Sequence, residues 1–392
     1  MSDTRAPLRV AMVGYAFMGR AHSQGWRTAP RFFDLPVDPE MAVLVGRTQS
    51  SAEEAARTLG WAEVSTDWRE VIERDDIDLV DICTPGHTHA EIAVAALRAG
   101  KHVLVEKPMA NTLAEAEEMT RAAQEAASNG VLSMVGFTYR RVPAVQLARQ
   151  LVAEGRIGEV RQVRAQYLQD WLADADAPLS WRLDKEKAGS GALGDIGAHI
   201  VDLTHFITGQ RVTGVAGMLD TFVTERPVAE SFSGLHGTGG SERGPVTVDD
   251  AALFLGRLSG GAPATFEATR YAWGRKNAMR IEVSGSTGSL AFDFEEMNVL
   301  SLFDGTDDPR TAGFRRILVT EPDHPYIEHW WPAGHGLGYE HGFTHQVVDL
   351  CEAVAAGEQP RPSFEDGLAV QRVLDAVERS SADRSVMTET GG

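Results

Sequence analysis

Short apolar runs alternate with helix-like segments over the first third of the chain. Between these runs, the segments SSAEEAARTLG, HAEIAVAALRAG and TLAEAEEMTRAAQEAASNG carry apolar residues with helical spacing, and each ends in a glycine suited to a helix C-cap. This alternation is typical of parallel strands joined by crossover helices, so it predicts a doubly wound parallel sheet. The candidate strands are residues 8–14, 41–46, 79–84, 102–106 and 131–137.

The pattern changes after a helix-like connector at residues 143–155. The segments EVRQVRAQYLQDW, DAALFLGRLSGGAPATFEATRYA and MRIEVSGSTGSLAFDF alternate apolar with polar residues between glycine-rich turns. Such alternation indicates a mainly antiparallel sheet with one apolar face. We also predict a helix at 194–208, a polar, glycine-rich surface loop at 230–245, and closing helices at 343–356 and 367–381.

The two patterns predict an α/β protein with two domains, which agrees with a length of 392 residues. We expect residues 1–140 to form the doubly wound domain. Residues 141–392 are expected to form an α+β domain that contains the large, mainly antiparallel sheet and the closing helices.

Composition restricts the partners and the compartment. The chain has 37 Lys and Arg against 56 Asp and Glu, a net charge of −19, and no basic run, so nucleic acid and anionic membranes are not expected partners. No stretch approaches the roughly 20 apolar residues that a membrane span needs, and no signal-type segment begins the chain. Cys83 and Cys351 lie far apart without a CxxC partner, so we expect reduced thiols and a cytoplasmic protein.

The first predicted strand runs into the glycine-rich turn GYAFMG, residues 14–19, which precedes a predicted helix. In this setting backbone amides and a helix N-terminus can hold a pyrophosphate, which predicts a Rossmann-type dinucleotide site. The alternative is a turn that needs glycine only for its positive φ angles. The expected cofactor contacts are Gly14, Ala16, Phe17, Met18 and Gly19, with Ala16 in place of the usual middle glycine.

The end of the second predicted strand bears on the choice between NAD and NADP. An NAD-specific site normally places an acid there, but this chain has Gly46 and Arg47. Arg47, with Thr48 and Ser50, can hold a 2′-phosphate, which favours NADP. The alternative is that Arg47 is a solvated loop residue or stacks on the adenine.

Three further residues are candidates for proton transfer and charge stabilisation. Lys107 follows the fourth predicted strand, at the sheet edge where open α/β folds bind ligands, and can stabilise an alkoxide, although surface lysines are common. Asp195 and His199 stand four residues apart at the start of a predicted helix, hence on one face. A histidine there can take a hydroxyl proton while the carboxylate orients the ring. The alternatives are a helix N-cap for Asp195 and a core position for His199.

Two other patterns were considered as sites. His341 and His345 have the same spacing, but no third ligand accompanies them, so we expect no metal. Several tryptophans stand among polar residues, in QDW (169–171), SWR (180–182) and the pair at 330–331. Aromatic faces interleaved with hydrogen-bonding groups suit a polyhydroxylated ring, and core packing is the alternative for each tryptophan.

Taken together, these motifs resemble the Gfo/Idh/MocA family of NAD(P)-dependent oxidoreductases over nearly the whole chain. The segments YLQDW, SWR and GSGALGD look especially like its levoglucosan dehydrogenase branch, which oxidises the C3 hydroxyl of an anhydrosugar. The resemblance rests on the glycine turn, Thr84-Pro85 with His89, Glu106-Lys107-Pro108, Tyr139-Arg140-Arg141, Asp195 with His199, and PSFEDG at 362–367.

The resemblance implies a Rossmann domain followed by a domain whose open sheet builds a homodimer or homotetramer. It implies that Lys107, Asp195 and His199 form the catalytic group. It adds Thr84, Pro85, His89, Glu106 and Lys107 to the cofactor contacts, beside Arg47 from the end of the second predicted strand. The implied substrate contacts are Lys107, Tyr139, Gln169, Trp171, Trp181, Arg182, Asp195 and His199. Two departures concern the cofactor: Gly86 stands where many relatives have asparagine near the nicotinamide ribose, and Gly46-Arg47 replaces the acid that is typical of strict NAD users.

The sequence therefore predicts an enzyme that oxidises a secondary hydroxyl of a sugar, an anhydrosugar such as levoglucosan, or a cyclitol by hydride transfer to NAD or NADP. His199 would take the proton, Asp195 would hold the imidazole, and Lys107 would stabilise the alkoxide, with the roles of Lys107 and His199 exchangeable. One alternative is a cofactor-binding regulatory or interaction protein of the same fold. Another is a metal-dependent sugar isomerase or hydrolase that uses His341 and His345.

Overall fold

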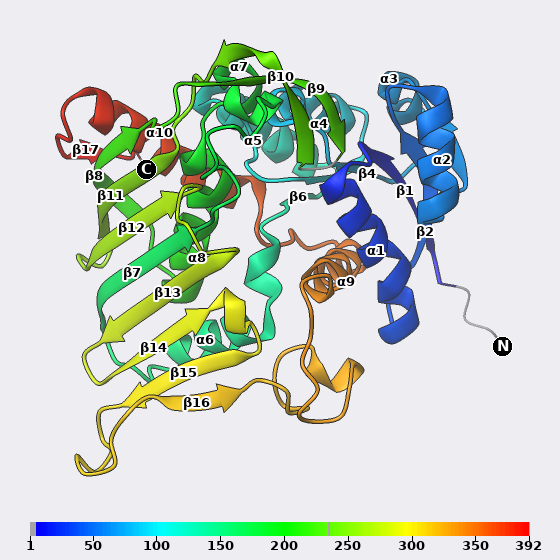
Figure 1. Ribbon diagram of the computed structural model, residues 1–392. Helices are drawn as coiled ribbons and strands as arrows, with labels where there is room; N and C mark the ends of the chain where they lie inside the picture. Colours follow the sequence, from blue (N-terminus) through cyan, green and yellow to red (C-terminus); the bar gives the residue numbers. More distant parts are fainter. Residues whose placement is uncertain (1–4, 234–235, 392) are drawn as a thin grey trace. The chain divides into compact units, whose positions relative to one another are not determined.

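The computed structural model describes residues 5–233 and 236–391, apart from the side chains of residues 230–237 (Figure 1). The chain forms two compact units. The first contains Met1–Thr138 and Tyr339–Leu368, and the second contains Tyr139–Gly338 and Ala369–Gly392. The second stretch of the first unit differs from our expectation, which assigned all of residues 141–392 to the second domain.

The return of the chain to the first unit is explained by a helix pair. Helix α9 (His341–Ala356) packs against α1 (Phe17–Phe32). A Cβ at Gly25 of α1 would lie 2.7 Å from the carbonyl oxygen of Phe343, so glycine is needed for this close approach. Contacts of this kind join residues more than 300 positions apart, and local periodicity does not reveal them.

The first unit contains the predicted doubly wound sheet of parallel strands, in the order β3-β2-β1-β4-β5-β6. Its inner strands are buried on both faces, because helices cover a parallel sheet from both sides. The order places β1 between β2 and β4, so the crossover direction reverses between β1 and β4, where such folds bind ligands. The strands are β1 (Pro7–Val13), β2 (Asp38–Val45), β3 (Glu63–Ser65), β4 (Leu79–Ile82), β5 (His102–Val105) and β6 (Ser133–Val135).

Local signals set the helices of this unit. Thr112 and Glu115 form a capping box at the start of α5, and Gly60 ends α2 in the left-handed conformation, as its C-cap role requires. The sequence did not predict β3, which is short and polar. The helices that follow α1 are α2 (Gln49–Leu59), α3 (Trp68–Ile72), α4 (His89–Arg98) and α5 (Leu113–Ala127).

The second unit is built on a nine-stranded sheet in the order β16-β15-β14-β13-β7-β12-β11-β8-β17. All its pairs are antiparallel except β7 with β12, which confirms the mainly antiparallel sheet. The strands are β7 (Val160–Leu168), β8 (Val212–Asp220), β11 (Ala251–Leu258), β12 (Pro263–Thr269), β13 (Ala278–Gly285), β14 (Gly288–Asp293), β15 (Val299–Asp304), β16 (Arg315–Leu318) and β17 (Thr388–Glu389).

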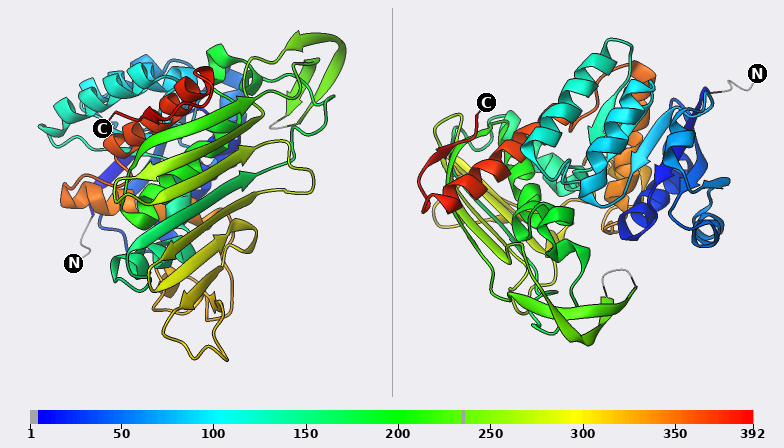
Figure 2. Two further views of the ribbon diagram at one scale, coloured as in Figure 1. Left: turned by 90° about the vertical axis from the view of Figure 1, so that its left-hand side faces the viewer. Right: turned by 90° about the horizontal axis from the view of Figure 1, so that it is seen from above.

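Helices cover one face of this sheet. Helix α8 (Ala198–Thr208) packs on β7 and β13, and α6 (Pro143–Ala153) packs on β14 and β15. The end of α10 (Phe364–Ala382) lies against β8, where Ser380 Oγ accepts the Gly217 N–H. The described helices of the unit leave the opposite face of the sheet open (Figure 2). No described helix is long and apolar enough to cross a membrane.

The predicted loop at 230–245 is wrong for the residues that the structure describes. Strands β9 (Glu225–Ser233) and β10 (His236–Pro245) pair in an antiparallel ribbon, while residues 234–235 lie outside the described residues. Register shifts around Gly239 absorb the glycine-rich sequence. Arg226 anchors the ribbon, because its buried guanidinium donates to the carbonyl oxygens of Leu172 and Asp174.

Candidate active site

The glycine turn between β1 and α1 has the geometry that a dinucleotide site needs. Gly14 has a φ of +97°, and a Cβ there would lie 2.8 Å from the carbonyl oxygen of Cys83. A Cβ at Gly19 would lie 2.2 Å from the carbonyl oxygen of Gly14. Ala16 makes no side-chain cap, so the first amides of α1 are open to an anion. Ala16 and Phe17 are exposed, and Met18 is half-buried. These residues fit a pyrophosphate.

The segment after β2 is exposed. Arg47, Thr48 and Ser50 are all on the surface, and Thr48 precedes the first residue of α2 without a side-chain cap. Gly46 makes room for Tyr15, since a Cβ at Gly46 would lie 2.1 Å from the Tyr15 ring. An exposed arginine beside a helix N-terminus suits a phosphate, and it equally suits a solvated loop residue.

His89 connects the loops that follow β4 and β5. Its Nε2 lies 2.8 Å from the carbonyl oxygen of Thr84, and its Nδ1 lies 3.1 Å from that of Pro108. Burial lowers the pKa of His89, with the backbone carbonyls acting in the opposite direction. The ring is 1% exposed, so the structure places His89 as a brace between two loops that the sequence assigns to the cofactor.

Lys107 is the second residue of the loop after β5. Its amide N–H donates to Glu106 Oε2 at 3.0 Å, and the peptide bond to Pro108 is cis. Lys107 is half-buried, whereas Glu106 is buried. The neighbouring Thr84 and Pro85 follow β4 after Cys83, so the ends of two adjacent strands carry these predicted cofactor contacts.

Sequence reasoning missed Asn111 in the same region. A Cβ at Gly86 would lie 2.3 Å from Asn111 Oδ1, so the Asn111 amide occupies the space that a side chain at position 86 would take. The sequence signal that could have indicated Asn111 was glycine at position 86, where many relatives have asparagine. A missing side chain leaves a volume, but only the structure shows which neighbour fills it.

In the second unit, Asp195 lies in a π-helical turn, Leu193–Gly197, that leads into α8. The predicted helix therefore starts with a wider turn than the α-helix that the spacing implied. Asp195 is not the N-cap, and its Oδ2 lies 3.7 Å from Nη1 of the buried Arg270. The Arg270 guanidinium also lies over the Trp171 ring.

Asp249 fixes the turn that carries Asp195. Its carboxylate accepts the N–H groups of Gly191 at 2.7 Å and Leu193 at 2.8 Å, and its carbonyl oxygen accepts the N–H of Ala192. Arg270 also donates to the Asp249 carbonyl oxygen, at 3.0 Å. Burial raises the pKa of Asp249, and the charge of Arg270 opposes this rise. Neither Asp249 nor Arg270 stood in a motif that the sequence analysis could use.

Three of the predicted substrate residues of this unit, Tyr139, Gln169 and Trp171, belong to one hydrogen-bonded chain. Tyr139 OH and Tyr167 OH are 2.8 Å apart, and Tyr167 donates to Asn277 at 2.7 Å. Gln169 donates to the same oxygen of Asn277, and the Trp171 indole N–H donates to Gln169 at 3.1 Å. The His199 ring, 7% exposed, lies 4.5 Å from the Tyr139 ring. The structure thus joins Tyr139, Gln169, Trp171 and His199, with Tyr167 and Asn277 as additional members.

The SWR segment (residues 180–182) lies near the Asp195 carboxylate. The Arg182 guanidinium lies over the Trp181 ring at 4.5 Å. Burial lowers the pKa of Arg182, and the charge of Asp195 opposes this shift while that of Arg270 adds to it. The sequence identified Asp195 and Arg182 as separate candidates. In the structure the charge of Asp195 acts on the Arg182 guanidinium.

His341 and His345 lie on α9 in the first unit. His345 is fully buried and meets Phe33 edge-on, and His341 Nδ1 lies 3.6 Å from Glu340. Within residues 5–233 and 236–391, neither belongs to a group of three ligating side chains that could hold a metal. The structure therefore gives no support to the isomerase alternative.

Comparisons with known proteins decide the family. Residues 8–137 match the model of an oxidoreductase family with an NAD-binding Rossmann fold, and residues 145–291 match the Gfo/Idh/MocA C-terminal domain. Levoglucosan dehydrogenase of Pseudarthrobacter phenanthrenivorans is 41% identical over 383 residues, 96% of this chain and 97% of that protein. The chain belongs to the Gfo/Idh/MocA family.

Solved structures of this family agree with the fold. An oxidoreductase domain protein from Kribbella flavida is 65% identical, with a TM-score of 0.94 and coverage of 99% and 100% of the two chains. Levoglucosan dehydrogenase in complex with NADH and levoglucosan is 39% identical, with a TM-score of 0.92 and coverage of 98% and 100%. As a Gfo/Idh/MocA protein with named dehydrogenase relatives, this chain is an NAD-binding oxidoreductase.

Proposed function

We propose that this protein oxidises a secondary hydroxyl of a neutral sugar, an anhydrosugar such as levoglucosan, or a cyclitol. The observation that carries the proposal is the hydrogen-bonded chain from Tyr139 to Trp171 beside His199. Aromatic faces that alternate with amide and hydroxyl groups suit a ring with an apolar C–H face and a polar rim. The likeness to levoglucosan dehydrogenase supports an anhydrosugar.

The residues that perform the chemistry in this proposal are His199, Lys107 and Asp195. The nicotinamide cofactor supplies a hydride acceptor. His199 takes the hydroxyl proton, because a histidine titrates near neutral pH. Lys107 stabilises the developing alkoxide with its positive charge. Asp195, beside the Arg270 guanidinium, favours the charged form of the imidazole that results.

The cofactor proposal follows from two segments of the first unit. The glycine turn receives the pyrophosphate, and the exposed Arg47 with Thr48 and Ser50 determines how well a 2′-phosphate is accepted. We propose that Asn111 provides the polar contact that a side chain at Gly86 makes in many relatives. NADH in the levoglucosan dehydrogenase complex supports NAD, while Arg47 allows NADP.

We also propose that two or four copies assemble through the open face of the nine-stranded sheet. Met218 of β8 and Leu253 of β11 are cross-strand neighbours on this face, and Leu255 lies two residues further along. Their exposed fractions are 58%, 43% and 56%. A contiguous exposed apolar patch on a sheet face is typical of an interface, and an isologous contact would bury it twice. Leu255→Glu should lower the mass measured by light scattering, and an unchanged mass would exclude this face.

A substrate screen tests the catalytic proposal. The protein is mixed with NAD or NADP and each member of a panel of sugars, anhydrosugars and cyclitols, and formation of reduced nicotinamide is followed by absorbance. We expect turnover with at least one neutral polyol that contains a secondary hydroxyl. Binding of dinucleotide without turnover on any member of the panel would instead favour the regulatory alternative.

A further inference from the structure

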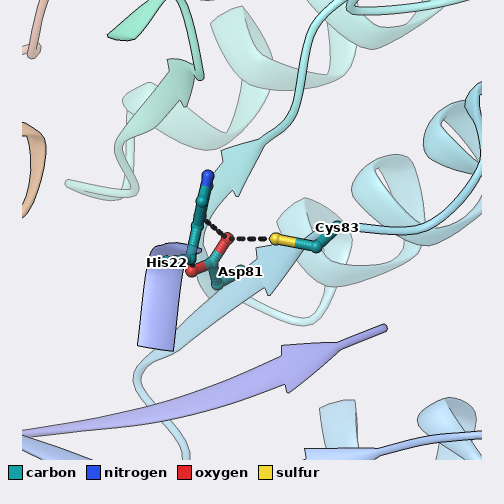
Figure 3. Close-up of side chains that lie close together, drawn as sticks. All are labelled: His22, Asp81 and Cys83. Atoms are coloured by element: carbon teal, nitrogen blue, oxygen red, sulfur yellow. Dashed lines mark hydrogen bonds and ion pairs between the residues drawn. The ribbon is translucent and has the colours of Figure 1, made fainter. Parts of the chain in front are cut away.

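A buried cluster of ionisable groups lies beneath the ends of β4 and β5 and is not used by the proposed chemistry. His22 of α1, Asp81 of β4 and Cys83 form its core, and Figure 3 shows the histidine and the cysteine on either side of the carboxylate. His22 is 1% exposed and Asp81 is fully buried. Glu106, the residue before Lys107, is 3% exposed and joins the cluster from the other side of the imidazole.

Every polar atom of the imidazole faces a carboxylate. His22 Nδ1 lies 2.9 Å from Asp81 Oδ1, and Nε2 lies 2.9 Å from Glu106 Oε1. The Trp26 indole N–H donates to Asp81 Oδ2 at 2.7 Å, and the Cys83 thiol donates to Asp81 Oδ1 at 3.5 Å. A neutral imidazole has one N–H and can donate to only one of the two carboxylates, whereas an imidazolium donates to both.

The charges favour the imidazolium. Burial disfavours a charged His22, but the charge of Asp81, the interaction with Cys83 and the hydrogen bonds to both groups outweigh burial and raise the pKa well above 6.5. Glu106 faces the second nitrogen, and α9 presents the uncharged Phe343 ring at 5.4 Å. Burial raises the pKa of Cys83, which keeps its thiol protonated near neutral pH. One cation therefore lies between two buried carboxylates.

The cluster is not arranged as a metal site. Its carboxylate oxygens lie at hydrogen-bond distances from His22, and Asp81 is also hydrogen-bonded by Trp26 and Cys83. A zinc ion needs several unprotonated donors at 2.0–2.3 Å around one point. One ligand atom each of His22, Asp81 and Cys83 lie within 4.8 Å of one another, but the imidazole and the thiol direct their protons at Asp81, and the second nitrogen of His22 meets Glu106.

The hydrogen bonds connect three segments that the family places at the cofactor. His22 lies on the helix that follows the glycine turn, and Asp81 precedes Thr84-Pro85 on β4. Glu106 uses its second oxygen, Oε2, to accept the N–H of Lys107 at 3.0 Å. A Cβ at Gly136 would lie 2.8 Å from Glu106 Oε1, so glycine at 136 leaves the space that this carboxylate occupies.

We propose that His22 is a positioning residue that remains an imidazolium, holds the Glu106 carboxylate, and through it fixes the backbone of Lys107. The imidazolium donates one proton to each carboxylate, and Glu106 fixes the Lys107 amide. The side chain that carries the Lys107 ammonium group then extends from a fixed backbone position. The functional consequence rests on the proposed role of Lys107 in catalysis, whereas the charge state and the backbone link do not.

The first experiment measures the charge state directly. In protein labelled with ¹⁵N-histidine, two-bond ¹H–¹⁵N correlations report whether each ring nitrogen carries a proton, and the His22 signals are those that disappear in His22→Gln. We expect both nitrogens of His22 to be protonated over a range around neutral pH, since the flanking carboxylates favour the charged form. One unprotonated nitrogen in this range would overturn the proposal.

The second experiment separates positioning from stability by comparing His22→Gln with Trp26→Phe. Both variants remove a buried hydrogen bond to Asp81, but only the first removes the contact with Glu106. We expect both to lower the melting temperature. Amide hydrogen exchange of Lys107 should accelerate only in His22→Gln. If His22→Gln does not fold, Glu106→Gln provides a second variant, because it keeps an acceptor without the charge. Equal exchange rates at Lys107 in the folded variants would refute the link.

Kinetics complete the test with the protein's own substrate. Misplacement of a catalytic group by about 1 Å can cost about 10²-fold, so His22→Gln should lower kcat at least about tenfold with little change in the NADH dissociation constant. Trp26→Phe should retain kcat within about twofold, because it removes one neutral donor to Asp81 and leaves the contact between His22 and Glu106 in place. The same kcat in both variants would refute positioning. If no polyol is oxidised by wild-type protein, the substrate proposal fails while the NMR and exchange results still decide the role of His22.

Discussion

Removal of the Asp249 carboxylate should disturb the turn that carries Asp195. In Asp249→Ala the N–H groups of Gly191 and Leu193 lose their acceptors. An unsatisfied buried polar group costs about 1–3 kcal/mol, so the two amides together cost about 2–6 kcal/mol of unfolding free energy. The turn can also shift, because its hydrogen bonds to Asp249 hold it against the start of β11. We therefore expect a loss of stability together with a loss of kcat.

The adjacent residue provides a matched control. Asp250 is also buried, and its carboxylate accepts two amides, those of Phe222 at 2.8 Å and Val223 at 3.0 Å. Asp250→Ala should therefore lose a similar unfolding free energy, measured by urea denaturation, without moving the turn at Asp195. At a temperature where both variants are folded, Asp249→Ala should have the lower kcat. Equal kcat values would show that the Asp249 hydrogen bonds do not position Asp195.

The same group gives a pH dependence. Burial raises the folded-state pKa of Asp249 above the unfolded value of 3.8. Its contribution to stability is then complete below pH 3.8 and is lost as the pH rises through the folded-state pKa. Asp249→Asn removes this titration, so the difference in unfolding free energy between wild type and Asp249→Asn should change over that pH window. A constant difference would contradict the raised pKa.

Three substitutions test the cofactor and substrate contacts. Arg47→Ala should weaken NADP binding more than NAD binding in a fluorescence titration, and an equal loss for both would show that Arg47 does not contact a 2′-phosphate. Asn111→Ala should raise the dissociation constant of NADH, since it removes the amide beside Gly86, whereas unchanged affinity would remove Asn111 from the site. Trp171→Ala should raise KM for the sugar with dinucleotide affinity retained, and a loss of thermal stability with normal kinetics would indicate a core role instead.

The sequence predicted those parts of the fold that depend on local periodicity. Parallel strands such as β4 are buried on both faces and appear as unbroken apolar runs, and the glycines at 14 and 19 satisfy steric requirements that a motif records. The ribbon at β9 and β10 was missed because polar, glycine-rich residues resemble a loop until a partner strand is known. The return of α9 to the first unit depends on a contact at Gly25 that no local pattern contains.

The candidate site likewise contains residues that the sequence could predict and residues that it could not. Asp195, His199 and the tryptophans stood in recognisable segments, whereas Asp249 and Arg270 act through single hydrogen bonds and an ion pair that only the fold creates. Asn277 links Tyr167 to Gln169 from the position just before β13, and no sequence motif surrounds it. The His22 ring meets two carboxylates that lie 59 and 84 positions away in the sequence.

The most direct test of the proposed function compares the rate of reduced-nicotinamide formation in wild type, Lys107→Met and His199→Ala, with the preferred cofactor and levoglucosan or the best polyol of the screen. General acid–base catalysis typically contributes about 10²–10⁴-fold, so each variant should lose at least about 10² in kcat while the glycine turn still binds the dinucleotide. Near-normal turnover in both variants would contradict the account.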